Sequence, residues 1–120
     1  MHDTKARDQF ERAFRDVAAY LIMKDGRTIA RLAIKFPRDG AGRVYAYLHV
    51  FGHDMVRGQA GGGGYDRQTA AVGDATAKLR KAVKDTDVST ETLLDAWRNC
   101  EGQGFASAAM SAGFDVRQAV

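Results

Sequence analysis

Three histidines, at positions 2, 49 and 53, and one cysteine are the residues of this 120-residue chain whose side chains most often serve in catalysis or metal binding. His49 and His53 are four apart, and Asp54 is the nearest further oxygen ligand. A strand and its turn do not align that spacing on one face, and closed metal sites need three or four converging ligands. Cys100 could meet a histidine as a nucleophile, but no nucleophile motif surrounds it. We expect no metal, no cofactor and no catalytic residue, and keep a small hydrolase or transferase using His49 or His53 as an alternative.

A tract of four glycines, residues 61 to 64, is followed directly by Tyr65 and Asp66. Asp66 is a good N-cap, so the bare amides before it could bind an anion at a helix start. A P-loop would need Gly-Lys-Ser/Thr at this point, and Asp66 would repel a phosphate. We therefore favour a packing role, in which bare backbone passes close to another element, and do not expect nucleotide binding. The candidate binding residues here are Gly62, Gly63, Gly64 and Tyr65.

The next segment, residues 67 to 84, has the pattern of a helix with one apolar face and one basic face. Val72, Ala75, Leu79, Ala82 and Val83 share the apolar face. The opposite side supplies the remaining candidate binding residues, which are Arg67, Lys78, Arg80, Lys81 and Lys84. These cations could contact a partner, or they could simply form a solvated helix face.

The net charge of +3 conceals an uneven distribution. Residues 1 to 84 hold 16 Lys and Arg against 9 Asp and Glu, a net charge of +7, while residues 85 to 120 hold 2 against 6, a net charge of −4. The two parts could form separate surfaces that steer an acidic partner, or they could pair within the chain. Sequence alone does not decide between these alternatives.

Length and composition indicate one folded domain covering residues 1–120. The single cysteine excludes an internal disulfide and fits a reducing compartment. The longest apolar run, residues 17 to 23, is too short to span a bilayer, and the polar N-terminus lacks the apolar core of a signal peptide. We expect a cytoplasmic protein that does not bind a membrane. The oligomeric state is left open.

Hydrophobic periodicity predicts an α+β fold. Asp3 or Thr4 can cap a first helix whose apolar stripe includes Phe10, Phe14 and Val17. Residues 20 to 23 could continue that helix, but Asp25-Gly26 is typical of a type I′ hairpin turn and favours a strand near 18 to 24. Alternation predicts further strands at 28 to 36, 44 to 51 and 55 to 59.

After the helix at 67 to 84 we expect a helix capped by Ser89, with Leu93, Leu94 and Trp97 on its apolar stripe. A short helical turn near 106 to 111 and a last strand containing Phe114 and Val116 follow. The predicted architecture is an antiparallel four- to five-stranded sheet with helices packed on one face, in the order α-β-β-β-β-α-α-β.

Two resemblances bear on function. From its first helix to Lys84 the chain resembles a double-stranded RNA-binding domain in element order, although Asp66-Arg67-Gln68 stands where that family has a run of lysines. The segments Gly61-Gly62-Gly63-Gly64-Tyr65-Asp66 and Ala112-Gly113-Phe114-Asp115, with the turn at residues 36 to 43, resemble small uncharacterised proteins encoded by bacterial phages and plasmids. This second resemblance spans most of the chain and implies an interaction protein that blocks host machinery, such as restriction or CRISPR complexes.

Three hypotheses follow, in order of preference. The first is a non-enzymatic interaction protein of mobile-genetic-element origin that binds and inhibits a host protein or nucleoprotein complex. The second is a nucleic-acid-binding module that uses the basic helix at 67 to 84. The third is the small hydrolase or transferase described above.

Overall fold

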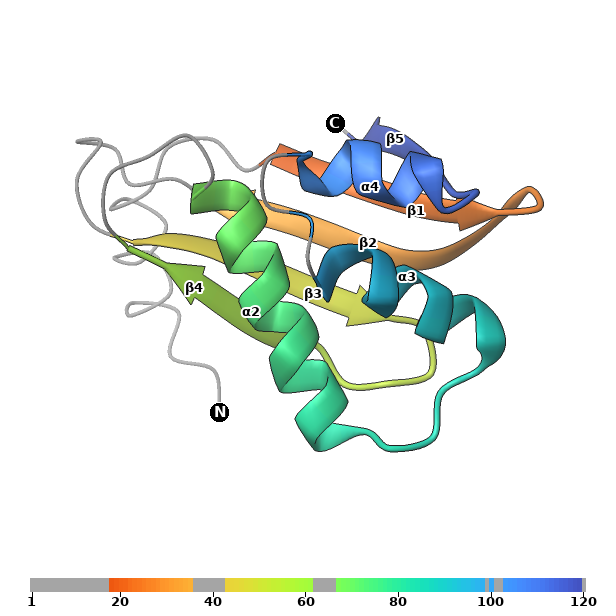
Figure 1. Cartoon of the computed structure of the whole chain (residues 1–120), viewed down its shortest axis with the longest axis horizontal. Coiled ribbons are helices and arrows are strands. Elements are labelled where there is room, and N and C mark those ends of the chain that lie inside the picture. Colours follow the sequence, from red (N-terminus) through yellow and green to blue (C-terminus); the bar gives the residue numbers. More distant parts are fainter. Residues whose placement is uncertain (1–17, 36–42, 62–66, 99, 101–102, 120) are drawn as a thin grey trace, which may run out of the picture.

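The computed structural model describes residues 18–35, 43–61, 67–98, 100 and 103–119. Its elements in chain order are β1 (Ala18–Lys24), β2 (Arg27–Lys35), β3 (Val44–Val50), β4 (Val56–Ala60), α2 (Arg67–Ala82), α3 (Val88–Arg98), α4 (Phe105–Ser111) and β5 (Asp115–Ala119). The strands form one antiparallel sheet in the order β4-β3-β2-β1-β5. The three helices lie in one layer over this sheet (Figure 1). The predicted α+β fold class is therefore confirmed.

The turn between β1 and β2 explains why residues 18–24 form a strand. Asp25 and Gly26 have φ angles of 51° and 78°, and a type I′ turn requires positive φ at both central residues. This turn twists in the sense that antiparallel strands need, so Lys24 pairs with Arg27 directly across it. The register then shifts by one residue between Ile22 and Met23, and this irregularity brings Tyr20 opposite Leu32.

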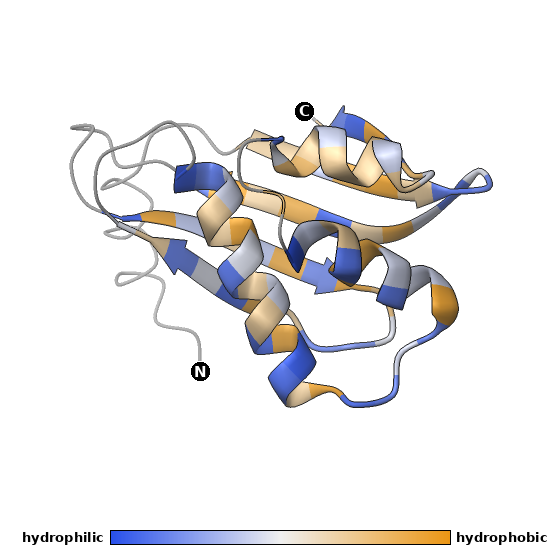
Figure 2. Ribbon diagram, viewed as in Figure 1, coloured by the Kyte–Doolittle hydropathy of each residue, from blue (hydrophilic) through white to orange (hydrophobic). Residues whose placement is uncertain are grey.

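Alternation along each strand gives the sheet two distinct faces. On β3, Val44, Ala46, Leu48 and Val50 are at most 1% exposed, whereas the residues between them are partly exposed on the other side. Figure 2 shows hydrophobic and hydrophilic residues following one another along β2 and β3. Because successive side chains of a strand point to opposite faces, one set of residues packs beneath the helices and the other set points away from them.

The helices fill the buried side with a single hydrophobic core. Helix α2 packs on β3 and β4, and it buries Val72, Ala75 and Leu79 as its sequence predicts. In α3 the fully buried Trp97 donates a hydrogen bond from Nε1 to the carbonyl oxygen of Phe105, at 2.8 Å. The Phe105 ring in turn meets Tyr20 of β1 edge to face, with ring centroids 5.2 Å apart. Trp97 and Phe105 thus join α3 and α4 to the sheet.

Among the described glycines, Gly58 of β4 has the closest backbone neighbours. A Cβ at this position would lie 2.2 Å from the carbonyl oxygen of Ala71 and 2.3 Å from the backbone nitrogen of Ala75, both in α2. Only glycine fits here without moving the helix or the strand. The glycine tract was predicted to have such a packing role, but a Cβ at Gly61 would meet only ordinary contacts, the nearest being Arg43 Cγ at 3.5 Å. The other glycines of the tract, residues 62 to 64, lie outside the described residues.

The structure corrects several predicted boundaries. Helix α2 ends at Ala82, so Lys84 lies beyond it. The predicted cap of α3, Ser89, is wrong: the Thr90 N–H donates to Asp87 Oδ1 at 2.7 Å, which makes Asp87 the capping residue. The short helix near residues 106 to 111 is α4, which begins at Phe105, and β5 does return to the sheet, next to β1. The described elements therefore run β-β-β-β-α-α-α-β, with one helix more after β4 than the predicted order.

The predicted first helix, with Phe10 and Phe14, lies outside the described residues. Within the described part of the chain, none of the helices combines the length and hydrophobicity needed to cross a membrane.

Candidate binding surface

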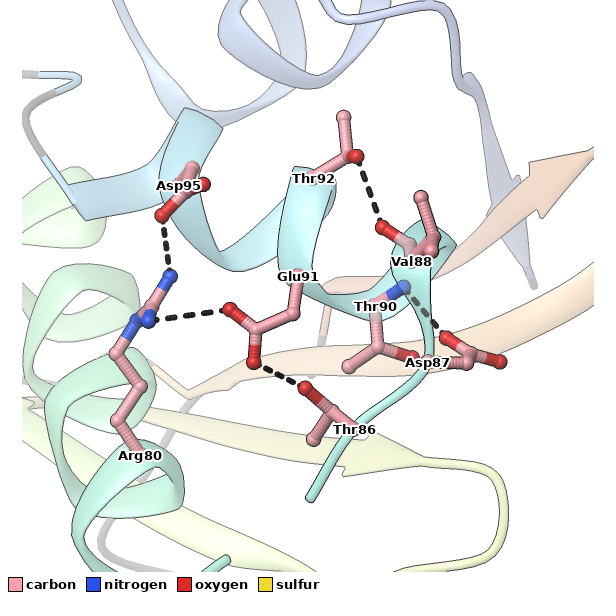
Figure 3. A network of polar contacts seen from close by, with 8 residues as sticks. All are labelled: Arg80, Thr86, Asp87, Val88, Thr90, Glu91, Thr92 and Asp95. Carbon is pink, nitrogen blue, oxygen red and sulfur yellow. Dashed lines mark hydrogen bonds and ion pairs between the residues drawn. The ribbon is translucent and has the colours of Figure 1, made fainter. Parts of the chain in front are cut away.

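Arg80, one of the predicted binding residues on α2, is engaged by acidic residues of α3 (Figure 3). Its Nη1 lies 3.3 Å from Glu91 Oε2, and its Nη2 lies 2.5 Å from Asp95 Oδ1. The Thr86 hydroxyl also donates to the Glu91 carboxylate. The acidic C-terminal part of the chain therefore pairs with the basic helix at this point, which is one of the two alternatives left open by the sequence.

Lys78 is paired as well, on the side of α2 that faces β4. Its Nζ lies 3.0 Å from Asp74 Oδ2 and donates to the carbonyl oxygen of Arg57, at 3.1 Å. Asp74 also accepts a hydrogen bond of 2.9 Å from the Gln59 N–H, at the edge strand. Burial raises the pKa of Asp74, but the hydrogen bonds from Gln59 and Lys78 and the Lys78 charge outweigh it, so the pKa lies below its ordinary value. This ionised carboxylate fastens α2 to β4.

The remaining predicted residues do not complete a basic patch. Arg67 begins α2, while Lys81 and Lys84 are exposed at its other end. With Lys78 and Arg80 held in ion pairs between them, the cations of this helix are interspersed with carboxylates. Gly62, Gly63, Gly64 and Tyr65 lie outside the described residues.

His49, His53 and the cysteine lie in different parts of the fold. His49 points away from the helices and stands beside Phe51, with ring centroids 5.6 Å apart. His53 is partly exposed in the turn after β3, where its backbone N–H donates to the carbonyl oxygen of Val50. Cys100 is buried under the helices, with its Sγ 3.5 Å from the carbonyl oxygen of Trp97. Within the described ranges, no three His, Cys, Asp or Glu side chains gather as metal ligands.

A different surface, which we call the open face, lies on the side of the sheet opposite α2, α3 and α4. Register and alternation place its residues, since antiparallel partners share a face. Each strand contributes alternate side chains, and the turn after β3 adds two more. The open face comprises Ala19, Leu21 and Met23 of β1, Arg31, Ala33 and Lys35 of β2, Tyr45, Tyr47 and His49 of β3, Phe51 and Met55 of the turn, Arg57 and Gln59 of β4, and Asp115, Arg117 and Ala119 of β5.

A hollow of about 480 Å³ lies in the middle of the open face. Its floor is a row of three alanines, Ala119, Ala19 and Ala33, which are direct partners across β5, β1 and β2. The row continues on β3 with Tyr47, whose ring stands at the edge of this floor. Neighbouring strands lie about 4.8 Å apart, so three adjacent methyl groups leave a shallow depression roughly 10 Å across.

Exposed apolar and aromatic side chains surround the hollow. Met55 is 59% exposed and Phe51 is 44% exposed, while Tyr47 and His49 are partly exposed. Isolated exposed apolar residues are ordinary, but a contiguous set with a hollow at its centre indicates an interaction site. These side chains form such a set, because Met55, Tyr47 and His49 all line the same depression.

Guanidinium groups stand over two of the aromatic rings of this face. Arg57 Cζ lies 5.0 Å from the centroid of Tyr45, and Arg31 Cζ lies 5.8 Å from that of Phe51. Arg117 occupies the same face on β5, opposite Leu21. All three arginines are exposed. The open face therefore combines apolar, aromatic and cationic groups.

This surface was not predicted from the sequence, although its pattern is visible there. Tyr45, Tyr47 and His49 alternate with buried residues, and this was interpreted only as a central strand with two apolar faces. Arg31 on β2 and Arg57 on β4 are the further indication, because a charged residue on each neighbouring strand is unexpected on a face that other layers bury. Strand register was needed to bring these residues together.

We compared the chain with models of protein families, with curated proteins and with solved structures, and found no match. The assignment of the open face as the candidate site therefore depends on the residues of that face alone.

Proposed function

We propose that this protein is a non-enzymatic binding protein whose partner contacts the open face of the sheet. The observation that supports this most directly is the contiguous set of exposed apolar and aromatic side chains around the alanine-floored hollow. Burying the exposed part of Met55 or Phe51 against a partner would contribute roughly 1 kcal/mol each, because about half of each residue is still accessible. Such residues are typical anchors of an interface.

The proposed partner is a host protein or nucleoprotein complex, and the proposed origin of the chain is a mobile genetic element. Both come from the resemblance to small phage and plasmid proteins carried by Gly61-Gly62-Gly63-Gly64-Tyr65-Asp66 and Ala112-Gly113-Phe114-Asp115. On this proposal the protein acts by occupying a surface of its target, in the manner of an anti-restriction or anti-CRISPR inhibitor. No group of the chain is required to do chemistry.

Helix α2 supports a binding role less well than the open face does. Its central cations, Lys78 and Arg80, already have carboxylate partners, and a ligand phosphate would have to displace them. Lys81 and Lys84 are exposed, so substituting them tests binding by helix α2 and serves as the control for substitutions on the open face.

Two methionines provide a matched test of the proposed function. Met55 on the open face is 59% exposed and Met110 on α4 is 54% exposed, so Met55→Glu and Met110→Glu make the same change on opposite sides of the molecule. The wild-type chain and both variants are immobilised and used to capture binding components from a bacterial lysate, with and without nuclease. We expect Met55→Glu to lose a component that the wild type and Met110→Glu both retain in stoichiometric amount.

Dependence on Met55, rather than capture itself, is the decisive result, because apolar surfaces also retain proteins unspecifically. Equal capture by Met55→Glu and the wild type, or loss with Met110→Glu instead, contradicts the proposal. Circular dichroism of both variants checks that the fold is intact.

A further inference from the structure

We infer that the ligand of the open face is single-stranded nucleic acid, with bases stacked on Tyr47 and Phe51 and phosphates held by Arg31, Arg57 and Arg117. This inference rests on the proposed function, because it names the ligand for the same face. The sequence predicted nucleic-acid binding on helix α2, whereas this inference assigns it to the open face on the other side of the sheet.

Two aromatic side chains of this face, Phe51 and Tyr47, are exposed enough for a base to reach them. Phe51 is 44% exposed, and its ring has His49 at 5.6 Å and Arg31 at 5.8 Å. Tyr47 is partly exposed at the edge of the hollow, next to the alanine floor. A flat unpaired base can lie against such rings whatever its identity, and stacking of this kind is a main source of affinity in proteins that bind single strands.

The alanine floor leaves room for a bound strand. Ala119, Ala19 and Ala33 fill so little space that a base resting on Tyr47 can enter the depression instead of standing above the sheet. Leu21 and Met55 supply apolar sides to the same hollow. A base edge would therefore be partly removed from water while its sugar and phosphate stay at the surface.

The charges of the open face match a polyanion. Three exposed arginines, Arg31, Arg57 and Arg117, come from β2, β4 and β5 and so surround the aromatic strand β3 and the hollow. Among the residues assigned to this face, Asp115 carries the one carboxylate, at the Met23 end of β5. Arginine also stacks on bases, so each guanidinium can contact either a base or a phosphate.

Single strands fit this surface better than a duplex does. In a duplex the bases stack on one another, so Tyr47 and Phe51 could reach only their edges, whereas an unpaired base offers its whole face. A second copy of this chain fits less well, because pairing two open faces about a two-fold axis would bring six arginines together. A protein partner is kept as an outcome of the test.

Fluorescence anisotropy of the purified full-length chain with fluorescein-labelled 12-nucleotide DNA and RNA strands of mixed sequence tests the inference. The same DNA sequence as a duplex serves as the competitor. We expect tighter binding to single strands, with log K falling against log salt concentration at a slope of roughly −2, since three phosphate contacts each contribute about 0.7.

Two pairs of variants locate the site. Tyr47→Ala removes the ring and should weaken binding roughly tenfold to a hundredfold, while Tyr47→Phe keeps the ring and should bind within about twofold of the wild type. Arg31→Gln combined with Arg57→Gln should weaken binding and make the salt slope shallower, from roughly −2 to about −0.7, whereas Lys81→Gln combined with Lys84→Gln should change neither. The arginine pair is exposed, so its result stands even if Tyr47→Ala unfolds the chain.

Absence of single-strand binding, or loss of binding in the lysine pair and not in the arginine pair, overturns this inference. If the chain binds no oligonucleotide but still captures a nuclease-resistant component that Met55→Glu loses, the proposed function stands and the partner is a protein. If capture is unaffected by Met55→Glu, the proposed function itself is contradicted.

Discussion

The two faces of this sheet differ in composition as well as in exposure. The covered residues that pair between β2 and β3 are all apolar, whereas the open face also carries arginines and a histidine. On β3, Leu48 is fully buried beneath the helices, whereas its neighbour Tyr47 borders a hollow on the open face. The covered face presents mainly aliphatic side chains that share one hydrophobic core with residues of α2 and α3, and the open face presents rings, alanines and arginines. The difference separates residues that stabilise the fold from residues that are available to a partner.

Adjacent substitutions on β3 should give the largest contrast between the faces. Leu48→Ala removes a buried side chain and leaves a cavity, so we expect the free energy of unfolding to fall by about 2 to 5 kcal/mol. Tyr47→Ala removes a larger but partly exposed side chain and should cost only about 1 kcal/mol. Urea denaturation followed by circular dichroism measures both values.

A loss of stability in Tyr47→Ala as large as that in Leu48→Ala would contradict the distinction between a covered face and an open face. It would mean that the open face is packed against another part of the molecule and is not a free surface.

The contact between β4 and α2 gives the next largest effect. Gly58→Ala places a methyl group where α2 backbone atoms lie 2.2 to 2.8 Å away, so we expect a loss of about 1 to 3 kcal/mol as the helix and strand separate. Gly61→Ala is the matched control, because its nearest neighbour is a flexible Arg43 side-chain atom at 3.5 Å, and it should be close to neutral. Thermal unfolding of the two variants checks the difference, and equal midpoints would show that the close approach does not constrain the sheet.

The smallest of these effects concerns the rim of the helix layer, where Asp87 caps α3. Hydrogen bonds from the Thr90 hydroxyl and N–H lower the pKa of Asp87, with smaller contributions from the charges of Arg27 and His53. Asp87→Ala should therefore reduce stability by about 1 kcal/mol at pH 7. Asp85→Ala, in the exposed connection nearby, should change stability by less than about 0.5 kcal/mol.

The pH dependence of this difference has a definite sign. Because the folded pKa of Asp87 is below the ordinary value of 3.8, the stabilisation is fully present above that value and is lost as pH falls through the folded pKa. The stability gap between the wild type and Asp87→Ala should thus be constant from pH 7 to about pH 5 and should shrink below about pH 4. A gap that persists unchanged at pH 2 would contradict the assignment of an ionised cap.

Much of the fold was predictable because its information is local. Asp25-Gly26 specifies a type I′ turn by backbone sterics, and the alternation around Leu32 and Leu48 specifies strands with one buried face. The cap of α3 was less predictable, since Asp87 and Ser89 are both good capping residues two positions apart.

The candidate site was much less predictable. Lys78 and Arg80 form a basic helix face in sequence, but Asp74, Glu91 and Asp95 reach them only after α2 has packed on β4 and beside α3. Arg31, Tyr47 and Arg57 lie on different strands, and only register makes them neighbours on the open face.

By itself, the sequence determined the strands, the hairpin turn and the apolar stripes of the helices after β4, because these depend on the conformational preferences of neighbouring residues. Tertiary structure decided which sheet face the helices cover, which cations are paired, and that Gly58 rather than Gly61 is the glycine at the close approach. The physical reason is that burial, ion pairing and backbone approach are interactions between residues distant in the chain, which only packing brings within a few ångströms of one another.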